Sequence, residues 1–510
     1  MTPPDETLAS QNSLTQHRET GVLLHISSLP SSNYVGDLGA DAKRFVDVLQ
    51  QMKVKVWQTL PINMPHADNS PYQCLSAHAG NPDYISLEDL VADGLLTPED
   101  LVLNDTHGIT QPKAHLFDKA YQTFNQQTES GANSAQNAAF EAFCKKQAHW
   151  LDDFTLFLAL RIKFNQTGWQ YWPEAYKNRD AEILNVARKE LSDDIARIQF
   201  TQYIFFSQWH ALKDYAASKG VRLFGDIPIF VAYDSADVWA QPQFFKLDAD
   251  KNMTVVAGVP PDYFSVTGQR WGNPHYNWDA MLADGFSWWV ARMTTQSELF
   301  DMVRIDHFRG LEAAWEIAAN EETAMNGQWV TAPGCPLLQA IKHALPNVIL
   351  IAEDLGIITA EVDALREKYH LPGMKILQFA FSGQEDNPYL PHNIDTESVV
   401  YTGTHDNDTT IGWYNTLDDH QRYHFHAYLA ALYSEEHTPS IPRDLINIAL
   451  ETNAFLAIIP MQDILALDGT NRMNVPGTST GNWSWRFEWS QLQASHISDF
   501  ANAVTHAKRN

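Results

Sequence analysis

Two acidic residues follow short apolar runs of the sequence in settings that suit acid and nucleophile chemistry. Asp306 follows the run 302–305, and Arg304 lies two positions earlier, hence on the same side of an extended strand. An adjacent guanidinium favours the ionised form of a carboxyl, which a nucleophile requires. We therefore predict Asp306 as a nucleophile, although a purely structural Arg–Asp pair would show the same motif.

Glu353 ends the next apolar run, 348–352, where burial would raise the pKa of its carboxyl and keep it protonated near neutrality. That property suits a general acid. A carboxylate nucleophile and a carboxylic acid roughly 5 Å apart form the pair that retaining glycoside chemistry uses.

The segment 402–408 places His405 and Asp406 together after a third apolar run. These side chains could bind sugar hydroxyls and stabilise an oxocarbenium-like transition state. A divalent-metal site is the alternative, since His405, Asp406 and Asp408 are suitable ligand types. No second His-rich strand end completes a metal set, and no P-loop or GxGxxG motif follows a strand, so we predict neither a metal nor a cofactor.

The elements that must position these residues are short apolar runs bounded by turn residues. Eight are found, at 21–25, 54–61, 222–229, 302–307, 348–354, 374–381, 399–406 and 455–463. Most are continuously apolar, which is typical of parallel strands covered on both faces. Helical patterns lie between them, for example at 41–52, 361–369 and 421–433. Eight alternations of strand and helix predict an α/β fold, a (β/α)8 TIM barrel.

Acidic residues stand at the carboxyl ends of five of these runs: Asp226, Asp306, Glu353, Asp406 and Asp463. In a TIM barrel the carboxyl ends of the strands form the active-site rim, so residues remote in sequence would meet there. A doubly wound sheet would also bind ligands at strand ends, and the count of eight favours the barrel.

Two intervals are too long for simple loops. We predict a flexible tail over 1–20 and a catalytic barrel over 21–510, interrupted by a helical insertion at 62–220 and a lid-bearing insertion at 230–300. Within the second, the glycine-containing stretch 256–278 is predicted as a long loop that folds over the site, with a passive surface loop as the alternative.

The composition narrows the classes of partner and compartment. A net charge of -27, from 35 basic and 62 acidic residues, disfavours nucleic-acid binding. Three cysteines without CxxC spacing indicate a reducing compartment. There is no signal-peptide pattern at the start and no apolar run of about 18 residues, so we expect a cytoplasmic protein without a membrane partner.

The motifs taken together resemble a known family. VRIDHFRG around Asp306, IAEDLG around Glu353 and YTGTHDND around Asp406 are similar to motifs of amylomaltases, the 4-alpha-glucanotransferases of glycoside hydrolase family seventy-seven. Further similar segments lie at 70–73, 79–82, 225–229, 268–274 and 473–478, and the resemblance runs from about Gly21 to Trp485.

The resemblance implies a (β/α)8 barrel with helical insertions on the C-terminal rim, and a transferase of α-1,4-glucan segments in maltodextrin, glycogen or starch metabolism. Its donors would be α-1,4-glucans and maltooligosaccharides, with glucose as an acceptor and a glycosyl-aspartate intermediate. By the resemblance Asp306 is the nucleophile, Glu353 the acid/base and Asp406 the transition-state stabiliser.

The same resemblance implies the binding residues. Those that contact sugar near the cleavage point are Tyr72, Asp226, Arg304, His405 and Asn474, and those of the lid are Asp262, Phe264, Gln269 and Trp271. An α-amylase-type hydrolase and an inactive glucan-binding protein are the alternative functions. The oligomeric state, monomer or homodimer, stays open.

Overall fold

The computed structural model describes residues 17–31, 35–101, 113–261, 265–433 and 437–509. Its centre is a sheet of eight parallel strands with the order β10-β11-β12-β1-β2-β3-β6-β9. They are β1 (Glu19–Leu23), β2 (Val56–Gln58), β3 (Arg222–Ile227), β6 (Met302–Ile305), β9 (Ile349–Ala352), β10 (Gly373–Ile376), β11 (Ser398–Tyr401) and β12 (Leu456–Pro460).

The two end strands of this sheet meet. The Ala352 N–H at the end of β9 donates to the Pro372 carbonyl oxygen, immediately before β10, at 2.9 Å. The sheet therefore closes into a barrel, and every predicted apolar run supplies one of its strands. The prediction of a (β/α)8 TIM barrel is confirmed.

Alternate residues of the strands fill the inside of the barrel, and their character changes towards one end. The inward layers are apolar, with Phe224, Met302 and Ile351 all buried. Two residues further along the same strands, the inward positions are Asp226, Arg304 and Glu353. Each buried apolar side chain stabilises the fold by about 1.5–3 kcal/mol, whereas buried charges require partners. The polar end of the barrel is thus the place to look for a site.

Helices cover the outside of the barrel. In α2 (Ala40–Gln51) the residues Ala42, Phe45, Val46 and Leu49 are buried, which is the i, i+3, i+4, i+7 spacing of a helix with one apolar face. Other helices that follow or precede barrel strands are α13 (Gly334–Ala344), α14 (Ala360–Lys368), α15 (Thr410–Thr416), α16 (Asp419–Leu432), α17 (Arg443–Glu451), α18 (Met461–Ile464) and α19 (Ala494–His506).

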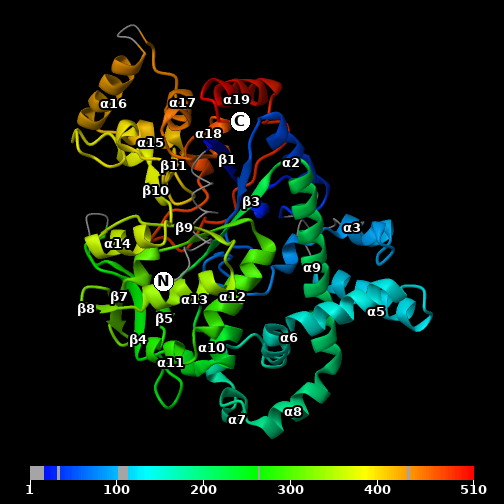
Figure 1. Cartoon of the computed structure of the whole chain (residues 1–510). Helices are drawn as coiled ribbons and strands as arrows, with labels where there is room; N and C mark the ends of the chain where they lie inside the picture. The colour runs from blue at the N-terminus through cyan, green and yellow to red at the C-terminus, as the bar shows by residue number, and fades with distance from the viewer. Residues whose placement is uncertain (1–16, 32–34, 102–112, 262–264, 434–436, 510) are drawn as a thin grey trace, which may run out of the picture.

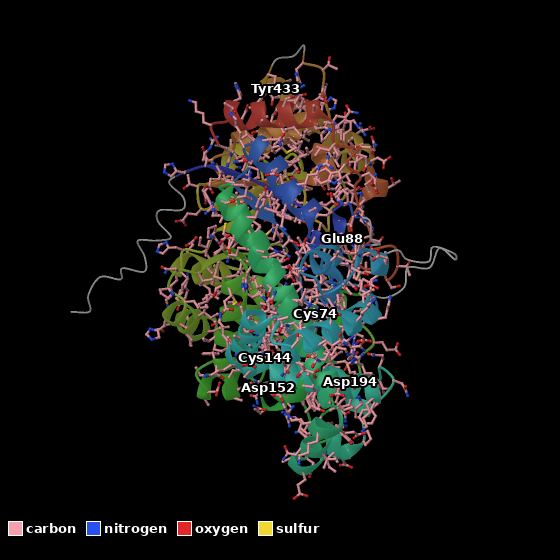
Figure 2. The ribbon with its side chains drawn as sticks, turned by 90° about the vertical axis from the view of Figure 1, so that its right-hand side faces the viewer. Cys74, Glu88, Cys144, Asp152, Asp194 and Tyr433 are labelled. Carbon is pink, nitrogen blue, oxygen red and sulfur yellow. The ribbon has the colours of Figure 1, made fainter. Side chains whose placement is uncertain are left out.

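The interval between β2 and β3 is helical. It contains α3 (Leu87–Ala92), α4 (Pro98–Leu101), α5 (Ala114–Glu129), α6 (Ser134–Lys163), α7 (Glu174–Lys177), α8 (Ala181–Glu190) and α9 (Ser192–Ser218). Helices α5 to α8 extend away from the barrel (Figure 1). In Figure 2, Cys144, Asp152 and Asp194 of this region lie at the end of the molecule opposite Tyr433, which follows α16.

Helix α9 also belongs to the barrel, which the predicted insertion at 62–220 did not anticipate. The Tyr215 hydroxyl donates to Asp47 Oδ1 of α2 at 2.8 Å, and the Trp209 indole N–H donates to the Leu299 carbonyl oxygen at 2.8 Å. Leu299 ends α12 (Ser287–Leu299), whose buried residues likewise face the barrel. The last part of each predicted insertion therefore packs as a barrel helix.

A second sheet was not predicted. Strands β4 (Val255–Val259), β5 (Gln269–Pro274), β7 (Ala313–Ala318) and β8 (Gly327–Thr331) pair antiparallel in the order β5-β4-β7-β8. The prediction of one long loop over 256–278 was therefore wrong for β4 and β5. Its glycines suggested a loop, but Gly258 lies inside β4, where a Cβ would come within 2.1 Å of the Gln269 carbonyl oxygen. Short helices α10 (Ala236–Ala240) and α11 (Trp278–Ala283) flank this hairpin.

The remaining expectations concern the chain start, the cysteines and membranes. Strand β1 begins at Glu19, so two residues assigned to the tail belong to the barrel. Cys74, Cys144 and Cys335 are free thiols. Within the described ranges, no helix combines the length and the apolar character needed to cross a bilayer. A cytoplasmic location stays a prediction.

Candidate active site

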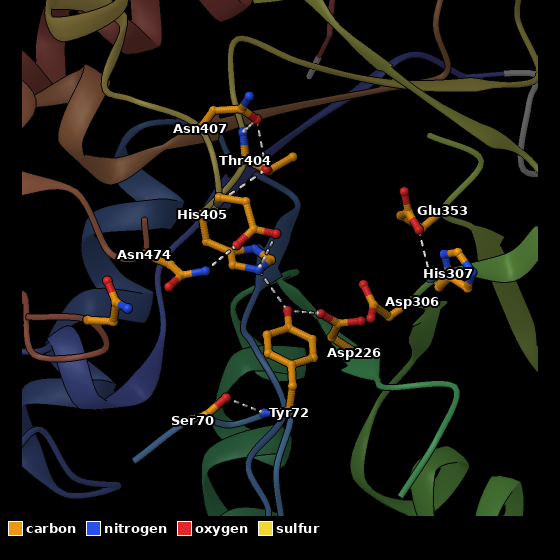
Figure 3. A network of polar contacts seen from close by, with 12 residues as sticks. Ser70, Tyr72, Asp226, Asp306, His307, Glu353, Thr404, His405, Asn407 and Asn474 are labelled. Carbon is orange, nitrogen blue, oxygen red and sulfur yellow. Dashed lines mark hydrogen bonds and ion pairs between the residues drawn. The ribbon is translucent and has the colours of Figure 1, made fainter. Parts of the chain in front are cut away.

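An ion-pair network of Asp226, Arg304 and Asp306 lies at the carboxyl ends of β3 and β6. Figure 3 shows Asp226 and Asp306 with the other polar residues around them. Asp226 and Arg304 are direct neighbours in the parallel register. Arg304 donates from Nε and Nη2 to the two carboxylate oxygens of Asp226, at 2.8 and 2.7 Å, and from Nη2 to Asp306 Oδ1 at 2.8 Å. The two-point contact fixes the guanidinium plane, so Arg304 holds Asp306 in a defined orientation.

Tyr72 extends this network to the opposite side of the rim. Its hydroxyl donates to Asp226 Oδ2 at 2.7 Å, lies 3.1 Å from Arg304 Nη2 and 2.9 Å from His405 Nε2. The Tyr72 and His405 rings are stacked, with centroids 5.4 Å apart. Tyr72 comes from the segment after β2 and His405 from the segment after β11, so with β3 and β6 the network joins four distant parts of the chain.

Asp406 lies next to His405, with Oδ2 at 3.3 Å from the imidazole Nε2. The Asn474 side-chain amide donates to Asp406 Oδ1 at 2.6 Å, and Arg472 Nη2 donates to the Asp406 carbonyl oxygen at 2.9 Å. These contacts fix both the backbone and the carboxylate of Asp406. Its side chain nevertheless keeps 46% of its surface exposed, so it is free to meet a ligand.

Glu353 faces the same end of the barrel from β9. The His307 N–H donates to Glu353 Oε2 at 2.6 Å and the Leu355 N–H donates to Oε1 at 3.1 Å. Ile305 of β6 and Ala352 of β9 are register partners. The residues that follow them, Asp306 and Glu353, therefore lie side by side at the carboxyl ends of the two strands. Parallel strands lie about 4.8 Å apart, which is close to the separation that a retaining carboxyl pair requires.

Burial raises the pKa of both carboxyls. It raises the pKa of Glu353 to about 7, against the opposing charge of Arg304. Burial also raises the pKa of Asp306, which the Arg304 guanidinium opposes. The Asp306 side chain keeps 31% of its surface exposed and contacts Arg304 directly, whereas Glu353 makes its hydrogen bonds to neutral N–H groups. The direct ion pair with Arg304 favours the ionised form of Asp306, and burial favours the protonated form of both carboxyls.

The predicted sugar-contacting residues Tyr72, Asp226, Arg304, His405 and Asn474 all belong to this network. Gln269 and Trp271 do not. The Trp271 indole N–H donates to Gln269 Oε1 at 3.1 Å, and the Trp271 ring packs edge-on against His307, on the Glu353 side. Asp262 and Phe264 lie outside the described residues. The role of all four in a lid stays a prediction.

Asp463 is a correction to the predicted rim. Its buried carboxylate accepts hydrogen bonds from the Thr402 hydroxyl at 2.6 Å and from the Thr410 N–H and hydroxyl at 2.7 Å each. Both oxygens are therefore used to tie β12 to the segment after β11. Asp463 supports the loop that carries His405 and Asp406 and is not free to take part in chemistry.

Two residues of the site were missed from the sequence. Arg472 holds the Asp406 carbonyl, and His307 donates its backbone N–H to Glu353. The signals were weak: His307 directly follows Asp306 in the motif, and Arg472 precedes Asn474 by two residues. The left-handed backbone of His307, with φ 51°, could not be recognised without the structure.

The comparisons with known proteins agree with each other. A family model described as 4-alpha-glucanotransferase matches residues 24–492. The 4-alpha-glucanotransferase of Thermus thermophilus is 45% identical over 488 residues, covering 94% of this chain and 96% of the relative. The chloroplastic/amyloplastic 4-alpha-glucanotransferase of Solanum tuberosum is 43% identical, covering 92% and 82%. An amylomaltase from Streptococcus agalactiae, solved with acarbose, has a TM-score of 0.91 at 35% identity, covering 97% of this chain and 100% of that one.

Proposed function

The chain belongs to the 4-alpha-glucanotransferase family, and from this premise we propose that it transfers α-1,4-glucan segments through an ester on Asp306. It is a glycosyltransferase, and its family acts on α-1,4-glucans and maltooligosaccharides. Beyond the family's activity, we propose the covalent intermediate and the roles of the individual residues. We also propose glucose as an acceptor and a place in maltodextrin, glycogen or starch metabolism.

The first half-reaction breaks the glycosidic bond. Glu353 donates its proton to the bridging oxygen while an Asp306 carboxylate oxygen attacks the anomeric carbon, giving a glycosyl ester and a free sugar hydroxyl. In the second half-reaction, Glu353 accepts the proton of an acceptor 4-hydroxyl as that oxygen displaces Asp306. Configuration is retained because the anomeric carbon is inverted twice.

The proposal rests on the different contacts of two carboxyl groups, Asp306 and Glu353, which lie side by side at the ends of β6 and β9. Asp306 contacts the Arg304 guanidinium at 2.8 Å, which favours a carboxylate nucleophile. Glu353 is buried and has a raised pKa, which favours a carboxylic acid. We therefore assign the carboxylate state to Asp306 from its direct ion pair with Arg304, and the role of the acid to Glu353.

The other residues of the network suit binding and charge stabilisation. Asp406, held by Asn474 and Arg472, presents a carboxylate to a developing oxocarbenium ion. Tyr72 and His405 present polar groups beside it. Burial lowers the pKa of His405, so its imidazole is neutral near pH 7 and both accepts and donates hydrogen bonds.

Incubation with maltotriose tests the proposed activity. A transferase gives a ladder of longer oligomers together with glucose and maltose, because each glycosyl group passes to another sugar. An α-amylase-type hydrolase gives only shorter products, and an inactive glucan-binding protein gives none. Separation of the products by length distinguishes the three outcomes.

The pH dependence of kcat/KM on maltotriose follows from Glu353. The step needs the protonated acid, so activity is retained below its pKa and is lost as pH rises through about 7. Above that pH we expect a decrease of about tenfold per pH unit. A profile that stays flat from pH 6 to 9 would contradict the assignment of Glu353 as the acid.

Chelation should leave turnover unchanged. Within the described part of the chain, no group of three or more His, Cys, Asp or Glu side chains is placed to hold a metal ion. His405 Nε2 already contacts Tyr72 and Asp406. Activity after dialysis against EDTA should equal that of the untreated protein. A loss that a divalent ion reverses would support a metal site at His405 and Asp406.

A further inference from the structure

His307 has three unusual properties at once. Its backbone is left-handed, with φ 51° and ψ 51°, a conformation that costs a non-glycine residue about 1–2 kcal/mol. Its N–H makes the short 2.6 Å hydrogen bond to Glu353 Oε2. Its imidazole Nε2 is buried and has no hydrogen-bond partner among the residues that the structure describes. A strained backbone and an unpartnered buried nitrogen persist only when other contacts hold the residue in place.

The His307 ring packs against Trp271. The two rings meet edge to face, with centroids 4.9 Å apart and an interplanar angle of 88°. Trp271 belongs to β5 of the second sheet, and its neighbour Asn273 anchors that strand by donating to the Val231 carbonyl oxygen at 3.0 Å. The barrel strand β6 and the hairpin strand β5 thus meet at this ring pair.

We propose that His307 is a positioning residue, held by Trp271, that couples the β4–β5 hairpin to the acid/base Glu353. This inference rests on the proposed role of Glu353. The ring contact holds the side chain of residue 307, and the backbone hydrogen bonds from the Phe308 N–H to the Glu353 carbonyl oxygen and from the Gly310 N–H to the His307 carbonyl oxygen hold its backbone. In this left-handed conformation the His307 N–H points at the Glu353 carboxylate. Anything that moves Trp271, including a sugar packed against it, changes the hydrogen bond that Glu353 receives.

The direction of the effect follows from which form of Glu353 the N–H stabilises. A donor favours the ionised carboxylate, so this hydrogen bond lowers the pKa of Glu353 and works against burial. If the His307 N–H turns away, the pKa of Glu353 rises, so Glu353 becomes a weaker proton donor in the first half-reaction and a stronger base in the second. Loss of one charge-assisted hydrogen bond corresponds to about one to two pH units.

Other groups that face Glu353 must be kept unchanged in the test. From β6 these are Arg304 and Asp306, from its own strand end Asp354, and from the segment after β10 Tyr389. The His307 imidazole itself has a pKa lowered by burial to about 4, so it is neutral over the range of interest. A shift near pH 7 in variants of His307 or Trp271 therefore reports on Glu353.

The variants come in two matched pairs. His307→Ala and Trp271→Ala each remove one ring, whereas His307→Phe and Trp271→Phe keep an aromatic contact. Phenylalanine tolerates the required backbone in this chain, since Phe286 has φ 60°. For each variant we would measure the pH at which kcat/KM on maltotriose falls on the alkaline side. We would also follow the infrared carboxyl band of Glu353 as a function of pH. That band is identified as the one missing from Glu353→Gln.

We expect both Ala variants to move the alkaline limb and the infrared titration upward by about one to two pH units. Both Phe variants should give the same two titrations as the parent. A change of KM with no shift of either titration in Trp271→Ala would overturn the proposal and make these rings simple packing or sugar contacts. The infrared titration does not depend on turnover. Should Glu353→Gln remain active on maltotriose, the proposed function fails, while the His307 contact is still tested separately.

Discussion

Asp306→Asn should abolish transfer from every donor, whatever its leaving group. The amide has nearly the same shape as the carboxylate but cannot form a stable glycosyl ester, so no first half-reaction occurs. We expect kcat/KM on maltotriose to fall by at least about 10⁴-fold, equivalent to about 5.5 kcal/mol at the transition state. Product separation after long incubation measures the residual turnover.

The fold provides the control for this loss. Arg304 keeps its two-point contact with Asp226 in the variant, so the network loses only one of its ion pairs. The unfolding temperature of Asp306→Asn should therefore lie within a few degrees of the parent. Near-normal maltotriose turnover in a folded Asp306→Asn protein would show that another residue is the nucleophile.

Glu353→Gln should fail in a different way, because it removes a proton donor and leaves the nucleophile intact. Maltotriose, whose leaving oxygen needs a proton, should react about 10²–10⁴-fold more slowly. A glycosyl fluoride needs no such proton and should still glycosylate Asp306. The two donors are compared in the same preparation, so a folding defect would reduce both rates together.

The trapped intermediate gives this second prediction a direct readout. Release of the ester to an acceptor needs Glu353 as base, so Glu353→Gln treated with glycosyl fluoride should accumulate a covalent adduct. Mass spectrometry of its peptides should locate the glycosyl group on Asp306. An adduct on Asp406 would reverse the proposed roles of these two residues.

Local patterns predicted much of the fold. The strands were visible because continuous apolar runs mark parallel strands buried on both faces, and eight of them became the barrel. Antiparallel strands β4, β5, β7 and β8 were not recognised. They are partly exposed and contain glycine at Gly258, Gly272 and Gly327, so neither an apolar run nor strand propensity distinguished them from loops.

The candidate site was predicted in part for a similar reason. Asp226, Arg304, Asp306 and Glu353 stand at or next to strand ends, and parallel strands bring those ends to one rim. The same rule wrongly included Asp463, because a strand-end carboxylate can serve a neighbouring loop instead. Only its hydrogen-bond partners distinguish the two cases, and those come from other parts of the chain.

The sequence by itself determined the barrel, the rim and the residue types on it, since these follow from hydrophobic period and from the parallel direction of the strands. Tertiary structure decided which groups touch. It brought Tyr72 within 2.7 Å of Asp226 across 154 positions, and it turned His307 left-handed beneath Trp271 so that a backbone N–H meets Glu353. Such contacts depend on how loops close and pack over long separations, and no local pattern of residues encodes that geometry.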